Sequence, residues 1–263
     1  MLGPEMSTPP SQDGPRPVAV LTVIAVRQVT PSVRRVTVTG DPTVVGTLEP
    51  TINLLVPRVD DPAPRWPTVA RDGRIVWSTG SHGVSLRSYT ARRQDPATGE
   101  LDVDFVLHGD GPAAAWAAAA RPGALLAVAG SGSLGFSPAG RLLLAADETA
   151  LPAVSRILAE VPAGTGGLAL LEVADADEEQ DLPGPDGVEI RWLHRGSTMP
   201  GESTLLVDAV AALDRPDGDV FAWVAAESAA VRAVRADLRA RWGLARAEHH
   251  AIGYWRRGRA MGG

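Results

Sequence analysis

The chain has 263 residues, enough for one large domain or two of ordinary size, and 44% of them are apolar, which is enough for a buried core. It contains no cysteine, which excludes disulfides, cysteine-ligated iron–sulfur clusters and cysteine nucleophiles, and all 25 basic residues are arginine, which excludes Schiff-base and phosphate-loop lysines. The net charge of −6 argues against general binding to nucleic acid.

The first residues are rich in proline and lack the apolar region of a signal peptide, so residues 1–16 are predicted to form a disordered tail. No apolar run approaches the ~18 residues that a membrane-spanning helix needs. We therefore expect a cytoplasmic protein that does not insert into membranes, and we expect it to be a monomer.

The next part of the chain has the pattern of β-strands. Short runs rich in β-branched residues end at proline, glycine or aspartate, and in residues 101–108 apolar side chains alternate with Asp102, Asp104 and His108. An alanine-rich helix is predicted over residues 112–121 and another strand over 124–130. Several short strands with one helix predict an antiparallel β-barrel domain over residues 17–137.

The last part alternates strands with helices. Strands are predicted at residues 141–147, 167–173, 188–194 and 220–227, and helices at 151–161, 203–213 and 228–242. This order predicts a parallel α/β sheet with helices on both faces, over residues 138–263. The "GSGSLG" run of residues 130–135 matches a dinucleotide-binding fingerprint, but Pro138 and Gly140 follow where a helix should begin, so an interdomain loop is predicted there.

Three stretches carry possible chemistry, although each alone also suits an ordinary strand, helix start or helix cap. In "RSYTAR", Arg87 and Tyr89 share one strand face, a pair that suits a flat heterocycle carrying phosphates. "HGDGPAAAW" begins a helix whose free N–H groups could bind an anion. In "AADETALPA", a strand enters a helix with Thr149 near the N-cap, and its two carboxylates favour contact with a ribose or nicotinamide over a pyrophosphate.

In this order, the three stretches resemble those of the siderophore-interacting proteins, FAD-dependent ferric-siderophore reductases of the ferredoxin-reductase-like superfamily. The resemblance continues through "EVADADEEQDLP", "WLHR", "AWVAAESAAVRAVRADLR" and "GYWRRG" and covers roughly residues 17 to 258. It implies electron transfer from NAD(P)H through FAD to ferric iron in a siderophore, with release of Fe²⁺. A ferredoxin is an alternative donor. No catalytic acid or base is needed, and no protein metal site is expected.

The resemblance also implies roles for individual residues. Arg87 would pair with the FAD phosphates, Tyr89 would stack on the isoalloxazine, and Thr90 would approach flavin N5. The pyrophosphate and adenine side would be lined by His108, Gly111, Pro112, Ala113 and Ala114. The NAD(P)H cleft would be bordered by Asp147, Glu148, Thr149, Ala150 and Glu227. The anionic ferric complex would be held by Arg256 and Arg257.

Some positions depart from the family pattern. Ala114 stands where a serine is common, and Asn53 and Gly132 stand where basic residues are usual, so two positive charges on the substrate side are missing. Two alternatives therefore stay open: a flavin oxidoreductase with another acceptor, such as free flavin, quinone or a protein carrier, and a siderophore-binding protein without turnover. The choice between NADH and NADPH also stays open, since Arg195 or the outward arginines of residues 228–242 could bind a 2′-phosphate.

Overall fold

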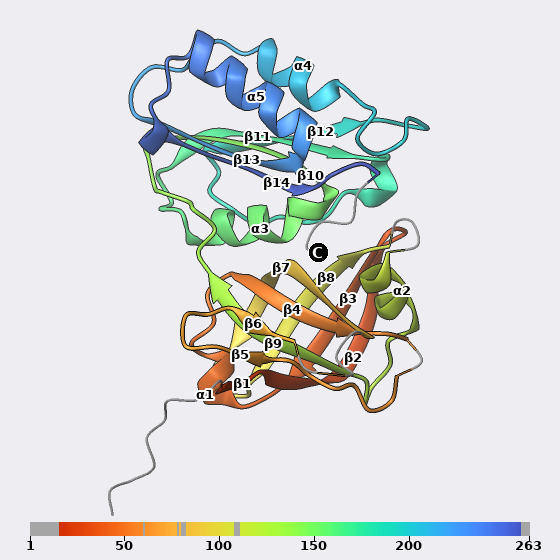
Figure 1. The fold of residues 1–263 in the computed structure, drawn as a ribbon. Helices are drawn as coiled ribbons and strands as arrows, with labels where there is room; N and C mark the ends of the chain where they lie inside the picture. The colour runs from red at the N-terminus through yellow and green to blue at the C-terminus, as the bar shows by residue number, and fades with distance from the viewer. Residues whose placement is uncertain (1–15, 60, 78, 80–82, 108–110, 259–263) are drawn as a thin grey trace, which may run out of the picture.

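The computed structural model describes residues 16–59, 61–77, 79, 83–107 and 111–258. The predicted tail, except Arg16, and the candidate His108 lie outside these residues. The described chain forms a β-barrel stacked against a parallel α/β sheet (Figure 1). This is the fold class that we predicted from the sequence.

The barrel is closed and antiparallel. Its strands, in the order in which they pair, are β2 (Ala19–Thr30), β3 (Val33–Thr39), β8 (Glu100–Val106), β7 (Val84–Asp95), β4 (Thr51–Pro57) and β9 (Leu125–Gly132). The predicted alternation in β8 is confirmed. Leu101, Val103 and Phe105 are buried in the barrel core, while Asp104 pairs with Arg35 through hydrogen bonds of 2.6 and 2.7 Å.

Smaller elements cover the barrel. The helix α1 (Pro42–Val45) follows β3, and a three-stranded sheet joins β1 (Arg16–Pro17), β5 (Thr68–Val69) and β6 (Ile75–Val76). The strand β1 therefore includes Arg16, which we had assigned to the tail. The predicted helix after β8 is α2 (Pro112–Ala119), and it ends two residues earlier than expected.

The α/β domain contains five parallel strands. In spatial order they are β12 (Val188–His194), β11 (Gly166–Val173), β10 (Arg141–Asp147), β13 (Val220–Glu227) and β14 (His249–Trp255). The helix α3 (Leu151–Glu160) covers one face, and α4 (Leu205–Ala211) and α5 (Ser228–Arg241) cover the other (Figure 1). Short 3₁₀ turns are η2 (Glu148–Ala150), η3 (Ala176–Glu178) and η4 (Arg246–Glu248). No described helix is both long and apolar enough to cross a membrane.

Residues 133–140 connect the two domains without a helix. The loop predicted over residues 130–135 starts later than expected, because residues 130–132 still belong to β9. Direct contacts also join the domains. The carboxylate of Glu178 accepts hydrogen bonds from Thr30 Oγ1 at 2.5 Å, Ser32 N at 2.8 Å and Ser32 Oγ at 2.7 Å. Arg156 of α3 donates to the carbonyl of Ala91 in β7 at 2.8 Å. These contacts bring the carboxyl end of the sheet toward the barrel.

Candidate functional site

The barrel wall is split between β7 and β8. The β8 ladder reaches β7 only at Ala91–Asp95, whereas Val84–Thr90 pairs with β4 alone in the described part of the chain. The helix α2 contacts β3, β4, β7 and β8 and so lies across this split. Backbone N–H and C=O groups along the free edge of β7 need partners, and a planar ligand with polar edges can supply them.

Two of the predicted flavin residues lie along this free edge. Tyr89 packs on Phe105 with ring centroids 4.5 Å apart, and Phe105 in turn contacts Trp116 of α2 at 5.6 Å. Burial raises the pKa of the Tyr89 hydroxyl above its usual value. Arg87 is half-buried on the same strand face and donates to the Leu86 carbonyl at 2.6 Å. An aromatic wall and a guanidinium therefore stand on one side of the split.

The start of α2 is suited to an anion. Gly111 is its N-cap, Pro112 is in its first turn, and no side chain of the described residues caps the first N–H groups. Among the described residues, no atom lies within 4 Å of a Cβ built on Gly111. Ala113 is buried and Ala114 half-buried, so Ala114 offers a backbone N–H there but no hydroxyl. Together with Arg87, these groups fit a pyrophosphate.

At the carboxyl edge of the parallel sheet, Asp147 gathers donors from three segments. Its Oδ1 accepts from Thr149 N at 3.0 Å and Thr149 Oγ1 at 2.5 Å, and its Oδ2 accepts from Glu227 N at 3.0 Å and Trp255 Nε1 at 2.7 Å. Asp147 therefore caps the turn η2. The N-cap of α3 is the buried Ala150, one residue after Thr149, in agreement with the predicted position of Thr149 near the helix start. Burial, and next the charge of Glu148, raise the pKa of Asp147 to about 7.

Two other predicted carboxylates are also held by hydrogen bonds. Glu227 caps α5 by accepting from the N–H groups of Ala229 and Ala230, and its other oxygen accepts from Arg257 N at 3.3 Å. Glu148 makes a two-pronged ion pair with Arg195, with N–O distances of 2.9 and 2.6 Å. The side chains of Glu148 and Arg195 are only 8% and 7% exposed. Because both carboxylates are hydrogen-bonded within the protein, they stabilise the structure of the sheet edge rather than present an unpaired negative charge to a ligand.

The barrel and the sheet meet at Thr90. This buried threonine, predicted to approach the flavin, lies beside the hydroxyl of Tyr254 in β14 and partly offsets the effect of burial on the pKa of that hydroxyl. Burial, the largest effect, raises the pKa of Tyr254 to about 12. The neighbouring Trp255 donates to Asp147, as described above. Two adjacent aromatic residues of β14 therefore lie beside Thr90 of the barrel and Asp147 of the sheet. In "GYWRRG", the family resemblance had implied a role only for Arg256 and Arg257.

The predicted substrate side is less complete. Arg256 and Arg257 are exposed, and Arg257 NH1 pairs with Glu202 Oε1 at 2.5 Å. Asn53 Oδ1 accepts from Ser88 Oγ at 2.9 Å on the outer face of the barrel. In the part of the chain that the structure describes, no atom lies within 4 Å of a Cβ built on Gly132. Among the described residues, no cluster of three or more histidine or acidic side chains could hold a metal ion.

Comparison with known proteins matches both domains to families. Residues 22–134 match the siderophore-interacting FAD-binding domain, and residues 139–258 match the siderophore-interacting protein family. Ferric vibriobactin reductase ViuB of Vibrio cholerae is 35% identical over 195 residues, which are 72% of this chain and 70% of that protein.

Solved structures agree with this assignment. A siderophore utilization protein from T. fusca is 37% identical, with a TM-score of 0.81 over 92% of this chain and 93% of that one. The siderophore-interacting protein SipS from Aeromonas hydrophila is 31% identical, with a TM-score of 0.78 over 94% of both chains. A ferredoxin NADP⁺ reductase from Neisseria gonorrhoeae, 12% identical with a TM-score of 0.59, shares the fold. The chain therefore belongs to the siderophore-interacting protein family, FAD-dependent oxidoreductases built on the ferredoxin-reductase-like fold.

Proposed function

We propose that this protein passes electrons from NADH through FAD to ferric iron held in a siderophore. The observation that carries the proposal is the contact between β7 and the second domain, where Arg156 of α3 donates to the Ala91 carbonyl at 2.8 Å. This contact holds the free edge of β7 beside the carboxyl edge of the parallel sheet. A flavin on the first and a nicotinamide on the second would then be neighbours. The name of the Vibrio cholerae relative supports a ferric complex as the acceptor.

The barrel residues would hold FAD in the split of the wall. Arg87 and the first N–H groups of α2 would bind its pyrophosphate, and the Tyr89 ring would cover one face of its isoalloxazine. The free edge of β7 would donate to and accept from the polar rim of the ring system. Bound FAD supplies the conversion of a two-electron donor into single-electron steps.

The sheet edge favours NADH over NADPH as the donor. Both terminal nitrogens of the Arg195 guanidinium are bound to Glu148, and the pair is buried, so Arg195 does not serve a 2′-phosphate as the sequence had allowed. Acidic side chains also follow β11, where nucleotide-binding domains hold the adenosine ribose. They would repel a 2′-phosphate but accept hydrogen bonds from a ribose hydroxyl. We expect NADH to be the better donor in steady-state kinetics.

The substrate needs no ligand from the protein. One hydride carries two electrons, which reduce two ferric ions in succession and release one proton. Hard oxygen chelators bind Fe²⁺ much more weakly than Fe³⁺, so reduction frees the metal. Because reduced nicotinamide is supplied in the cytoplasm, the proposed reaction belongs there.

The test starts from the visible spectrum of the purified protein with added FAD. Under anaerobic conditions NADH should bleach the flavin bands, and a ferric siderophore should restore them. Bleaching by reduced ferredoxin alone would identify a protein donor. Faster reoxidation by quinone or free flavin than by any ferric complex would favour a different acceptor, and tight siderophore binding without flavin uptake would favour a binding protein without turnover.

A further inference from the structure

Arg92 of β7 is a half-buried arginine to which the proposed function gives no role. Its Nε is shielded from solvent and has no hydrogen-bond partner among the described residues. Burial, the largest effect, lowers the pKa of its guanidinium. Because burying a charged group without a hydrogen-bonded partner costs free energy, a charge in this position calls for a functional explanation.

Arg92 stands at the closed end of the split between β7 and β8. The register of the two strands shifts between Ala91 and Arg93, so Arg92 occupies a β-bulge, a feature that re-aims side chains next to active sites. Ala91 is buried in the barrel core, so strand alternation turns Arg92 to the outer face. There α3 packs on β7, and the charge of Arg156 in α3 acts on Arg92. The guanidinium therefore lies where the two domains meet.

The charge of Arg92 is not neutralised by an ion pair. None of the ion pairs between described residues includes it. The carboxylates that act on it are Asp104 and Asp102, and both already have closer partners. Arg35 binds both oxygens of Asp104 at 2.6 and 2.7 Å, and Arg93 pairs with Asp102 at 2.9 Å. Arg92 therefore adds a positive charge to this interface.

This charge is close to the strand edge that we assign to the polar rim of FAD. The free edge of β7 runs from Val84 to Thr90, and Thr90 is two residues from Arg92. Two residues of a strand span about 7 Å. At such distances a charge in a partly buried site acts strongly on its surroundings without direct contact.

We propose that Arg92 makes the bound FAD easier to reduce, by holding a positive charge at the closed end of the split. This inference rests on the proposed function and adds to it a residue that sets the reduction potential of the flavin. A hydride from NADH brings two electrons and one proton, so the ring system gains one negative charge. A fixed positive charge nearby favours the form that carries more negative charge. Arg92 is thus a positioning residue for charge rather than a catalytic residue.

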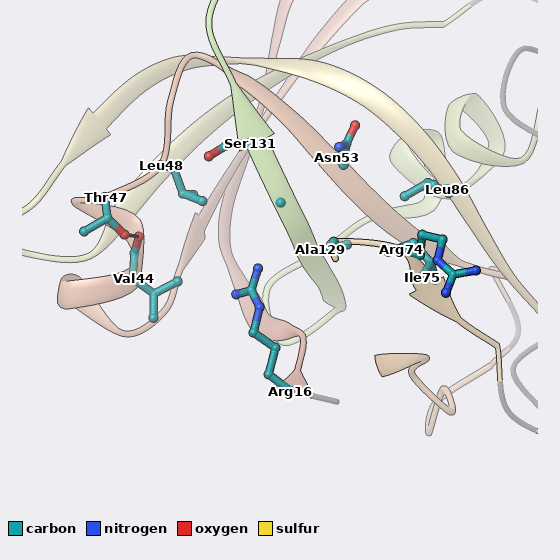
Figure 2. A pocket seen from close by; sticks show the side chains of 12 residues that line it. Arg16, Val44, Thr47, Leu48, Asn53, Arg74, Ile75, Leu86, Ala129 and Ser131 are labelled. Carbon is teal, nitrogen blue, oxygen red and sulfur yellow. Dashed lines mark hydrogen bonds between the residues drawn. The ribbon is translucent and has the colours of Figure 1, made fainter. Parts of the chain in front are cut away.

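The test measures the reduction potential of FAD bound to the whole protein, in equilibrium with a reference dye and without any iron complex. Arg92→Gln and Arg92→Met remove the charge, and Arg92→Lys keeps it. Arg74→Gln is the matched control. Arg74 lines the pocket on the outer face of the barrel that Figure 2 shows, and its side chain is 82% exposed, so water screens its charge. Flavin absorbance per chain verifies folding.

We expect both neutral variants to shift the equilibrium toward oxidised FAD about tenfold, which for two electrons is a fall of about 30 mV in potential. Arg92→Lys should keep most of the wild-type potential, and Arg74→Gln should keep all of it. Equal potentials in wild type and the neutral variants would overturn the proposal, as would an equal fall in Arg92→Lys or Arg74→Gln. If the potential falls as expected but no ferric complex reoxidises the flavin, the role of Arg92 stands and the proposed function fails.

Discussion

Arg87 is the cation that we expect to bear most of the FAD phosphate binding. It is half-buried beside the free edge of β7, on the strand face that also carries Tyr89. A guanidinium in that position can make paired hydrogen bonds with a phosphate, and hydrogen bonds to charged groups are the stronger ones.

The variant Arg87→Ala should therefore retain FAD more weakly. Removing a charge-assisted contact of about 1.5–3 kcal/mol corresponds to a rise of roughly 10- to 100-fold in the dissociation constant. Flavin fluorescence titration of the apoprotein measures it, with Arg27→Ala as a control on the same barrel. Equal affinities for wild type and Arg87→Ala would show that β7 does not bind the phosphates.

Asp147 gives the protein a specific pH dependence. Its folded-state pKa is raised to about 7 by burial and by Glu148, above the ordinary value of 3.8. The folded protein then holds a proton that the unfolded chain releases, so this stabilisation is complete at low pH. It is lost as the pH rises from about 4 to about 7, by up to about 4 kcal/mol.

The variant Asp147→Asn cannot titrate there, so its free energy of unfolding should fall less over the same pH range. Urea denaturation at several pH values compares the two slopes, and a constant cost of the substitution does not affect them. Parallel curves for wild type and variant would contradict the assignment of the raised pKa to Asp147.

Among the elements, the turn η2 depends on a buried ion pair with the loop that follows β12. Glu148 belongs to this turn, and Arg195 comes directly after β12. Removing one member of a buried pair leaves the other charge without a partner, at a cost of about 3–5 kcal/mol.

We therefore expect Glu148→Gln to lower the free energy of unfolding by about 3–5 kcal/mol, and Arg195→Met combined with it to recover part of the loss. The double-mutant cycle, measured by denaturant unfolding, gives the coupling energy. A double variant as unstable as the sum of the two single variants would mean that the pair contributes no coupling.

Strong local periodicity made most elements predictable. The alternation around Asp102 and Asp104 located β8, and the helical spacing of Val231, Val234 and Leu238 located the buried face of α5. The sequence did not predict β14 as a strand or the split between β7 and β8. Both depend on pairing between distant segments, which leaves no local pattern.

The candidate site was predictable only in part for the same reason. The resemblance named Thr90 and Asp147, but their partners Tyr254 and Trp255 are more than a hundred positions away in the chain. Likewise, Arg195 looked available for a phosphate because nothing near it in sequence indicated its pairing with Glu148.

At the scale of the whole molecule, the carboxylate of Glu178 joins the α/β domain to the turn between β2 and β3. It is buried and accepts three hydrogen bonds from Thr30 and Ser32. Its loss would leave those donors unsatisfied and weaken the docking of the domains.

The variant Glu178→Ala should expose the connection at residues 133–140, so limited proteolysis there should become several-fold faster. Glu179→Ala is the matched control, because its exposed side chain pairs with His194 inside the same domain. Equal cleavage rates in the two variants would show that Glu178 does not hold the domains together.

The most direct test of the electron path through both domains is an anaerobic stopped-flow experiment on the FAD-loaded protein. We predict that NADH bleaches the flavin bands, and that an iron(III) tris-catecholate complex restores them while Fe²⁺ forms at two ions per NADH consumed. A protein that takes up no FAD, or a flavin that NADH reduces but no ferric complex reoxidises, would contradict the account.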